Sequence, residues 1–212
     1  MFDMIIFDMD GVILDSEPLH EKARIMISEE NNIFVSNDDL PDPVGKSSAE
    51  FWQIIFDICG ITDKSPVEFE KQQFELVGKL AVSDDVGCNP GLITLLDWCK
   101  ENNIIMGVAS SSNRPLIEYI LDGLNIKHYF SYIVAGEEAA RRKPAPDIYL
   151  KVLELSGIPK ERACAIEDSA AGIEAAKAAG LYCFGYSAPS ERVQDQSKAD
   201  KIITRLDAIC NL

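Results

Sequence analysis

The sequence predicts an α/β fold, a doubly wound parallel sheet into which a helical domain is inserted. Three observations favour this fold. Short apolar runs that are typical of buried strands alternate with helical patterns from residue 90 to the C-terminus. The stretch after the first strand contains helical patterns without a convincing strand. Polar side chains directly follow three of the predicted strands, at the edge where open α/β sheets bind ligands.

The first predicted strand is the apolar run at residues 4–7, and two carboxylates follow it. Asp8 and Asp10 are two residues apart, so in an extended chain they point to the same side. Gly11 allows the backbone to turn sharply just beyond them. Two crowded carboxylates repel each other unless a cation neutralises them. The pair therefore indicates an acid/base couple or a hard metal site, with ordinary turn chemistry of aspartate as the alternative.

The predicted helical domain covers residues 16–86. Its first helix begins near Ser16, with acidic charge and a proline in the first turn. Ser47 or Ser48 can cap the second helix, and a capping box with proline at the first helical position opens the third at Ser65. The remainder of the chain forms the predicted α/β core, residues 1–15 and 87–212.

Helices and strands alternate in the second part of this core. The predicted helices cover residues 91–100, 114–124, 147–156 and 170–179, with a short helix at the end of the chain. The predicted strands cover residues 104–109, 132–134, 163–166, 182–186 and about 201–204. Such alternation is typical of a parallel sheet with right-handed crossovers.

The composition is that of a globular protein, with 47% hydrophobic and 26% charged residues. The 20 basic and 35 acidic residues give a net charge of −15, which disfavours nucleic acid and anionic membranes as partners. The N-terminus runs directly into a strand, and no apolar run approaches the roughly 20 residues of a membrane span. The six cysteines show no metal-ligand spacing. We therefore expect a cytoplasmic monomer with neither nucleic-acid nor membrane partners.

Polar groups from three strand ends are expected to converge. Ser110 follows the strand at 104–109, and Glu167 and Asp168 follow the strand at 163–166. In a parallel sheet these ends lie at one edge, together with Asp8. Carboxylates from two strands make a natural Mg²⁺ site. Taken singly, the serine fits a plain capped loop and the acidic pair fits a helix N-terminus, so the interpretation depends on their convergence.

Lys143 is the candidate cation of this site. Pro144 and Pro146 hold its loop extended and stiff, so that the lysine is presented from a fixed backbone. A solvated loop lysine is the alternative. Beside a phosphate and several carboxylates, a cation is required electrostatically.

These residues, in this order, resemble the four motifs of the haloacid dehalogenase superfamily. The motifs are Asp8-Met9-Asp10-Gly11-Val12, Ser110, Lys143-Pro144 and Glu167-Asp168. The helical insertion resembles the C1-type cap, and three longer stretches resemble the β-phosphoglucomutase-like branch: residues 15–20, 143–147 and 166–172. The resemblance spans almost the whole chain and implies a Rossmann-like core. It is specific for the superfamily and the branch, and much weaker for a substrate.

The resemblance implies phosphoryl transfer through an aspartyl-phosphate. Asp8 would be the nucleophile that takes the phosphoryl group. Asp10 would protonate the leaving oxygen and then deprotonate the water or the acceptor hydroxyl. Ser110 and the next backbone amide, that of Ser111, would hold phosphoryl oxygens, and Lys143 would offset their charge.

The resemblance also implies a Mg²⁺ cofactor. Its ligands would be Asp8, the backbone carbonyl of Asp10 and Asp168, with Glu167 in or next to the coordination shell. His20 matches a histidine of the branch near the active site, although a lone helical histidine is as often a surface residue.

The predicted cap departs from the pattern of the mutases in this branch. Known phosphoglucomutases of the branch grip the non-reacting phosphate with a cap arginine shortly after a glycine. Here Gly45 is followed by Lys46, and a serine, Ser48, stands where the arginine would fall. Lys46 could substitute, but an ammonium matches phosphate less well than a bidentate guanidinium.

Three functions are therefore compared. The leading expectation is a Mg²⁺-dependent phosphatase of small phosphorylated metabolites, in particular sugar phosphates. The second is a phosphohexomutase such as β-phosphoglucomutase. The third is a non-catalytic phosphometabolite-binding domain on the same fold, which the complete set of Asp8, Asp10, Lys143 and Asp168 argues against.

Overall fold

The structure is a computed structural model, and it describes residues 2–36, 39–40, 47–83, 86–187 and 194–211. The chain divides into two compact units. The core unit comprises Met1–Asp15 and Asp85–Leu212, and the helical unit comprises Ser16–Asp84.

The core unit contains a six-stranded sheet in which every neighbouring pair of strands is parallel. Its strands are β1 Met4–Phe7, β2 Ile105–Ala109, β3 Tyr132–Val134, β4 Ala163–Glu167, β5 Tyr182–Tyr186 and β6 Lys201–Ile203, arranged in the order β3-β2-β1-β4-β5-β6. The predicted parallel α/β sheet is thereby confirmed.

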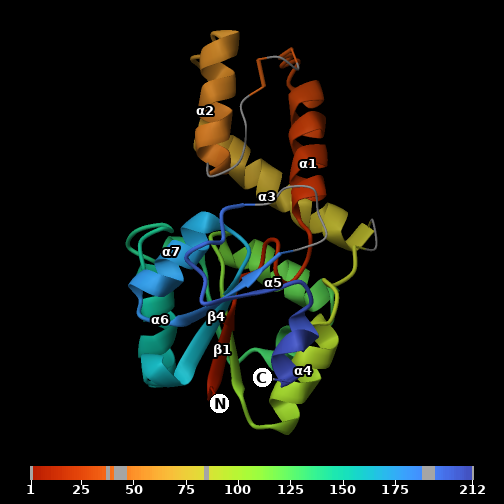
Figure 1. Ribbon diagram of the computed structural model, residues 1–212. Coiled ribbons are helices and arrows are strands. Elements are labelled where there is room, and N and C mark those ends of the chain that lie inside the picture. The colour runs from red at the N-terminus through yellow and green to blue at the C-terminus, as the bar shows by residue number, and fades with distance from the viewer. Residues whose placement is uncertain (1, 37–38, 41–46, 84–85, 188–193, 212) are drawn as a thin grey trace. The chain divides into compact units, whose positions relative to one another are not determined.

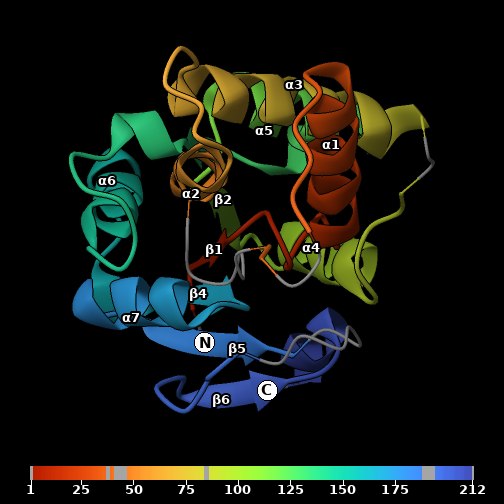
Figure 2. The same cartoon turned by 90° about the horizontal axis from the view of Figure 1, so that it is seen from above.

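Two layers of helices cover this sheet, as Figures 1 and 2 show. The helices are α4 Leu92–Glu101, α5 Arg114–Gly123, α6 Asp147–Ser156 and α7 Ala170–Ala178. The chain moves outward from β1 to β3 and then crosses back to β4. Because parallel crossovers are right-handed, α4 and α5 fall on one face and α6 and α7 on the other. Short 3₁₀ helices complete the unit: Lys127–Tyr129, Gly136–Glu138, Lys160–Arg162 and Leu206–Asn211.

Strand β1 lies in the interior of the sheet, between β2 and β4, and its side chains are apolar on both faces. All four of its residues are at most 1% exposed, as expected for a strand covered on both sides. Met4 and Ile6 belong to the core cluster that includes Tyr149 of α6 and Ile173 of α7. Phe7, one position on, faces the opposite layer and packs edge-to-face on Phe130 at 5.7 Å.

The helical unit consists of α1 Glu17–Glu30, α2 Ser48–Cys59 and α3 Pro66–Ser83. Either Ser47 or Ser48 was expected to cap α2. In the structure Ser47 is the N-cap, and it forms a capping box with Glu50. Gly60 ends α2 in the left-handed conformation. Three aromatic side chains form the centre of the unit, and they pack at centroid distances of 4.9–6.2 Å: Trp52, Phe56 and Phe69.

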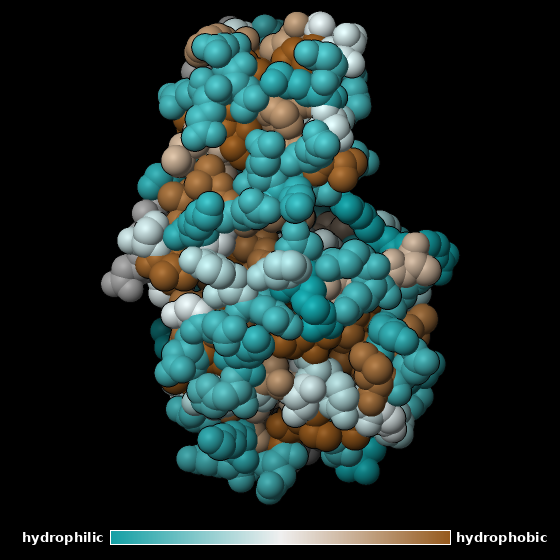
Figure 3. All heavy atoms as spheres, turned by 180° about the vertical axis from the view of Figure 1, so that it is seen from behind, coloured by the Kyte–Doolittle hydropathy of each residue, from teal (hydrophilic) through white to brown (hydrophobic). Residues whose placement is uncertain are grey.

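The surface is consistent with the acidic composition. The face in Figure 3 is mainly hydrophilic, with smaller apolar patches between the polar side chains. Among the described residues, no helix has both the length and the apolar character that crossing a membrane requires.

Candidate active site

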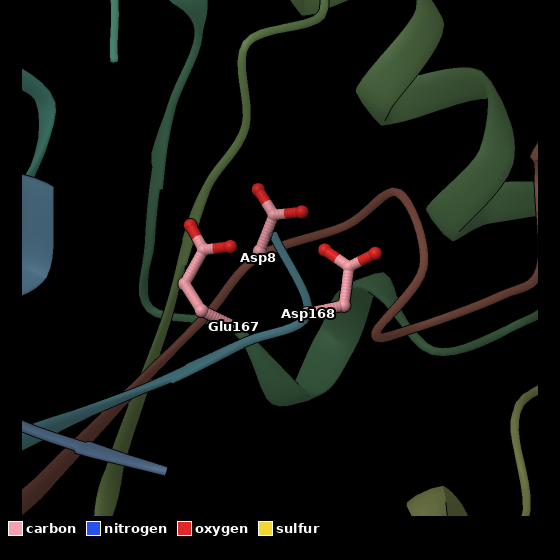
Figure 4. Close-up of side chains that lie close together, drawn as sticks. All are labelled: Asp8, Glu167 and Asp168. Carbon is pink, nitrogen blue, oxygen red and sulfur yellow. The ribbon is translucent and has the colours of Figure 1, made fainter. Parts of the chain in front are cut away.

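The carboxyl ends of β1, β2 and β4 bring the predicted polar residues to one edge of the sheet. Asp8 follows β1, Ser110 follows β2, and Glu167 and Asp168 lie at the end of β4. Figure 4 shows the carboxylates of Asp8, Glu167 and Asp168 close together. One oxygen from each of the three lies within 4.8 Å of the others. The chain winds from β1 to β3 toward one edge of the sheet and from β4 to β6 toward the other. The site lies between β1 and β4, where the direction of winding reverses, and this is the usual ligand position in such sheets.

A tight turn follows β1 and fixes the position of the first carboxylates. The backbone carbonyl of Met9 accepts the N–H groups of Val12 and Ile13, at 3.3 and 2.8 Å. Asn89 donates from Nδ2 to the carbonyls of Gly11 and Val12, at 2.8 and 3.0 Å. Glycine is required at position 11, because its φ is +81° and a Cβ there would lie 2.2 Å from Oδ2 of Asp168.

Lys143 lies between the carboxylates of Asp8 and Glu167. Its ammonium donates to Oδ1 of Asp8 and to Oε1 of Glu167, both at 2.6 Å, and to the carbonyl of Ala109 at 3.0 Å. An ammonium has three N–H groups, so these contacts use all of them. The lysine side chain is 7% exposed. The structure therefore holds Lys143 as a buried, fixed cation.

Asp10 is held from the end of β2. Its Oδ2 accepts hydrogen bonds from Ser110 at 3.3 Å and from Ser112 at 2.9 Å. Ser112 was not among the predicted site residues, whereas Ser111, which was, has an exposed side chain. The signal for Ser112 was its spacing, since side chains two apart in an extended segment point to the same side.

Glu167 is completely buried, and protein groups contact both of its carboxylate oxygens. Tyr149 donates its hydroxyl proton to Oε1 at 2.5 Å, alongside Lys143. Ser169 donates to Oε2 at 3.3 Å. A Cβ at Gly172 would lie 2.0 Å from Oε2, so the glycine of α7 leaves room for this carboxylate. Tyr149 was not among the predicted site residues, because its place in the sequence is that of an ordinary core position of an amphipathic helix.

The electrostatics of the site are those of crowded, buried acids. Burial raises the pKa of Asp8 well above its usual range, and the neighbouring carboxylates add to this while Lys143 opposes it. Burial and then Glu167 raise the pKa of Asp168 from 3.8 to about 8. Burial lowers the pKa of Lys143, but Asp8 and Glu167 outweigh it and the net shift is upward. One lysine thus faces several carboxylates, and a further cation would relieve their repulsion.

The donor set fits Mg²⁺. The ion prefers hard oxygen ligands and is usually bound by a few carboxylates together with water and phosphate oxygens. Asp8, Glu167 and Asp168 supply such oxygens within one small volume. The side chain of Asp10 is not in this group, and its Oδ2 accepts hydrogen bonds from Ser110 and Ser112. Its predicted role as a ligand through the backbone carbonyl stays a prediction.

The residues that the structure brings together all come from the core unit. His20 lies in the helical unit, where it is 9% exposed and packs edge-to-face on Phe74. Its Nδ1 lies 2.9 Å from Nε2 of Gln73, and Oε1 of Gln73 accepts the indole N–H of Trp52 at 2.9 Å. Gly45 and Lys46 lie outside the described residues.

The tautomer of His20 follows from this chain of hydrogen bonds. The indole N–H can only donate, so it fixes the amide of Gln73 with its oxygen toward Trp52. The amide nitrogen of Gln73 then donates to Nδ1 of His20, which leaves the neutral ring with its proton on Nε2.

A surface hollow of about 510 Å³ lies elsewhere in the core unit. It is lined by Thr94 of α4 and by residues of the C-terminal segment, including Thr204, Arg205 and Asp207. None of the convergent carboxylates lines it, and Arg205 is already paired with Asp207 at 2.9 Å. It contributes nothing to the site.

Comparison with known proteins gives consistent matches. A family model described as haloacid dehalogenase-like hydrolase matches residues 2–180. The phosphorylated carbohydrates phosphatase of Thermotoga maritima is 33% identical, over 84% of this chain and 82% of that protein. The β-phosphoglucomutase of Bacillus subtilis is 35% identical, over 85% and 81%. The crystal structure of CbbY from Rhodobacter sphaeroides in complex with phosphate has a TM-score of 0.86 and 25% identity, covering 99% of this chain and 96% of that one.

One relative is much longer than this chain. SUPPRESSOR OF QUENCHING 1 of Arabidopsis thaliana, a chloroplastic protein, is 31% identical over 85% of this chain, but the match spans only 17% of that protein.

Proposed function

Since this chain belongs to the haloacid dehalogenase-like hydrolases, in their β-phosphoglucomutase-like branch, we propose that it is a Mg²⁺-dependent phosphatase of small phosphorylated metabolites, in particular sugar phosphates. The observation that carries the proposal is the fixed contact between Lys143 and Asp8 at the end of β1, with Asp10 close in the chain. The printed names of the related sugar phosphatases support the substrate class.

The proposed reaction has two displacements. An oxygen of Asp8 attacks phosphorus, the bond from phosphorus to the sugar oxygen breaks, and Asp10 gives its proton to that oxygen. Water then attacks the aspartyl-phosphate and gives a proton back to Asp10, which releases inorganic phosphate and restores Asp8. Lys143 holds Oδ1 of Asp8 throughout, which leaves Oδ2 as the attacking atom.

Serines at the end of β2 complete the arrangement. Ser110 and Ser112 hold the carboxyl group of Asp10, so that its proton is delivered from a fixed position. We assign the backbone amide of Ser111 to the phosphoryl oxygens; the hydroxyl of Ser110 has one proton, so it can serve them only when Ser112 alone holds Asp10. Asp8 and Asp168, with Glu167 beside them, would hold Mg²⁺, and the bound ion would neutralise charge on the phosphoryl group.

A phosphohexomutase is the second candidate, because the B. subtilis β-phosphoglucomutase is 35% identical. The two functions differ in what attacks the aspartyl-phosphate, which is water in a phosphatase and a sugar hydroxyl in a mutase. By the resemblance to the mutases of this branch, Ser48, the first residue of α2, stands where the arginine that grips the second phosphate would fall. The missing guanidinium favours the phosphatase.

Phosphate release from a panel of phosphorylated sugars and nucleotides tests the proposal. We expect release that requires Mg²⁺ and stops in excess chelator. Interconversion of β-glucose 1-phosphate and glucose 6-phosphate is measured in parallel, with and without an added bisphosphate activator. Efficient interconversion with little phosphate released would reverse the ranking of the two candidates, and full activity in excess chelator would contradict the metal assignment.

A further inference from the structure

We propose that Tyr149 is a positioning residue of the phosphoryl-transfer site, which acts by fixing the carboxylate of Glu167 and, through it, the ammonium of Lys143 beside Asp8. The inference rests on the proposed function, because it assigns Tyr149 a part in the same reaction. Tyr149 lies on α6, whereas Glu167 lies at the end of β4, the next strand in the chain, so the contact joins a helix to the strand that follows it.

The alternation of β4 explains why Glu167 points toward Tyr149. Ala163, Ala165 and Glu167 occupy every second position of the strand and share one face. The two alanines belong to the core cluster that also contains Tyr149. The carboxylate of Glu167 is therefore directed into the layer of α6 and α7, where a polar group of that layer can satisfy it alongside Lys143.

Tyr149 supplies that group. Its hydroxyl donates a hydrogen bond to Oε1 of Glu167 at 2.5 Å. The tyrosine is 0% exposed, so this hydrogen bond lies inside the protein. Its ring also lies beneath Lys143, with Nζ 5.2 Å from the ring centroid, in the range of a cation–π contact.

The effect reaches the nucleophile through two further bonds. Oε1 of Glu167 is shared between Tyr149 and Lys143, and the same ammonium holds Oδ1 of Asp8. A buried carboxylate that loses one donor is left less well satisfied, and we expect it to turn toward the donors that remain. Because all three N–H groups of Lys143 are engaged, any turn of Glu167 changes the direction of the N–H that holds Asp8.

Packing alone does not require a hydroxyl at position 149. The surrounding cluster is apolar, and phenylalanine would fill the same space. Tyr186, on β5, shows that a buried tyrosine here can lack such a contact. It is also 0% exposed, but its hydroxyl has no hydrogen-bond partner among the described residues. Tyr186→Phe is therefore a matched control, which removes a buried hydroxyl without removing a hydrogen bond.

The experiment compares Tyr149→Phe with Tyr186→Phe in the full chain at saturating Mg²⁺. We expect Tyr149→Phe to lower kcat about 10–100-fold, the usual effect of removing an outer-shell partner, while KM stays within about twofold. Tyr186→Phe should leave both constants unchanged. In the Glu167→Gln background, Tyr149→Phe should cause little further loss, because the two residues act in one chain.

A second readout does not depend on activity. Nitrogen-15 spectra of lysine ammonium groups detect a buried, hydrogen-bonded ammonium through its slow proton exchange, and Lys143→Arg identifies its signal. We expect that signal to shift and to exchange faster in Tyr149→Phe, and to stay unchanged in Tyr186→Phe. Unchanged spectra together with wild-type kcat in Tyr149→Phe would overturn the inference, as would equal losses in both variants.

The two proposals fail in different ways. If the wild-type protein released no phosphate from any substrate, or if Asp8→Asn kept its activity, the proposed function would fail. The ammonium spectra would still decide whether Tyr149 positions Lys143. If the wild type were active through Asp8 while Tyr149→Phe matched it in rate and spectrum, only the inference about Tyr149 would fail.

Discussion

Asp8 supplies a nucleophilic oxygen and a negative charge, and loss of the first is measured by turnover whereas loss of the second is measured by thermal stability. Asp8→Asn keeps the shape and removes both. We expect turnover to fall below detection, because an amide is a very poor nucleophile. The unfolding temperature should be unchanged or raised, because the substitution removes one charge from a cluster in which burial and neighbouring carboxylates raise the pKa of Asp8.

Phosphate release and thermal unfolding are measured on the same Asp8→Asn preparation. Turnover in a sample free of contaminating phosphatase would rule out the aspartyl-phosphate route. A collapse of the unfolding temperature would instead show that the ion pair with Lys143 outweighs the repulsion.

Ser112 tests whether the hydrogen bonds to Asp10 matter for the reaction. Ser112→Ala removes the shorter of the two bonds, at 2.9 Å, in a side chain that is buried. We expect kcat to fall several-fold, corresponding to about 0.5–1.5 kcal/mol for one neutral hydrogen bond. Ser131→Ala, at an exposed position of the same unit, is the control. Equal rates for the two variants would show that Ser110 alone is enough to hold Asp10.

Single residues also show where prediction from the sequence reached its limit. The convergence of Asp8 and Asp168 could be predicted, because each follows an apolar run that is typical of a buried strand. Lys143 could be added because two prolines mark the loop that carries it. Tyr149 could not be found in this way, because its partner Glu167 is 18 positions away and no spacing rule connects a helix interior to the next strand end. Its contact depends on the packing of α6 against the sheet.

At the scale of elements, the helical unit depends on a polar group in its interior. Gln73 of α3 is 0% exposed, and it bridges Trp52 of α2 and His20 of α1. Gln73→Leu would leave the indole N–H and the imidazole without this partner. We expect a loss of about 1–3 kcal/mol in the free energy of unfolding, the usual cost of a buried polar group without its hydrogen bond.

The neighbouring position provides the control for that prediction. Gln72 lies on the same helix and is exposed, so Gln72→Leu makes the same chemical change outside the core. Urea unfolding followed by circular dichroism compares the two variants with the wild type. If both lost the same stability, the bridge between the three helices would not be what stabilises the unit.

Element boundaries were predictable where a cap or a turn marks them. The expected end of α2 at Gly60 and the expected end of α6 at Gly157 correspond to left-handed glycines in the structure. Strand edges were less certain. The predicted strand at residues 104–109 begins one residue later, and Ile104 instead closes the end of α4 through its N–H to Cys99. Local hydrogen bonding, rather than apolar character, decides such positions.

At the scale of the whole molecule, the order of the strands explains why distant motifs meet. Strand β1 lies between β2 and β4, so residues 8, 110 and 167 end at one place although most of the chain separates them. Alternation along the sequence predicts that the strands are parallel. The alternation does not predict the order of the strands in the sheet. That order depends on where the chain, after winding outward from β1 to β3, crosses back to β4.

The charge of the site should also be visible in the pH dependence of stability. Asp168 has a pKa of 3.8 when exposed and about 8 in the folded, metal-free protein. Between these values the folded state binds more protons than the unfolded state, so this group lowers the free energy of unfolding as pH rises from 4 to 8. The acids with lowered pKa, such as Asp200 and Glu138, act in the opposite direction, but at more acidic pH, where their contribution to stability is lost as pH falls.

The contribution of Asp168 is isolated by comparing the wild type with Asp168→Asn in chelator. The asparagine cannot titrate, so we expect it to stabilise the metal-free protein relative to the wild type, and to do so by several degrees more in unfolding temperature at pH 8 than at pH 5. A shift of one pKa unit corresponds to about 1.4 kcal/mol, which makes even a fraction of the expected shift measurable. Added Mg²⁺ should raise the unfolding temperature of the wild type most at pH 8, where its ligand is ionised, and should not do so for Asp168→Asn. A stability difference that is the same at both pH values would show that Asp168 is already ionised at pH 5, and hence that the carboxylates of this site are better solvated than their burial implies.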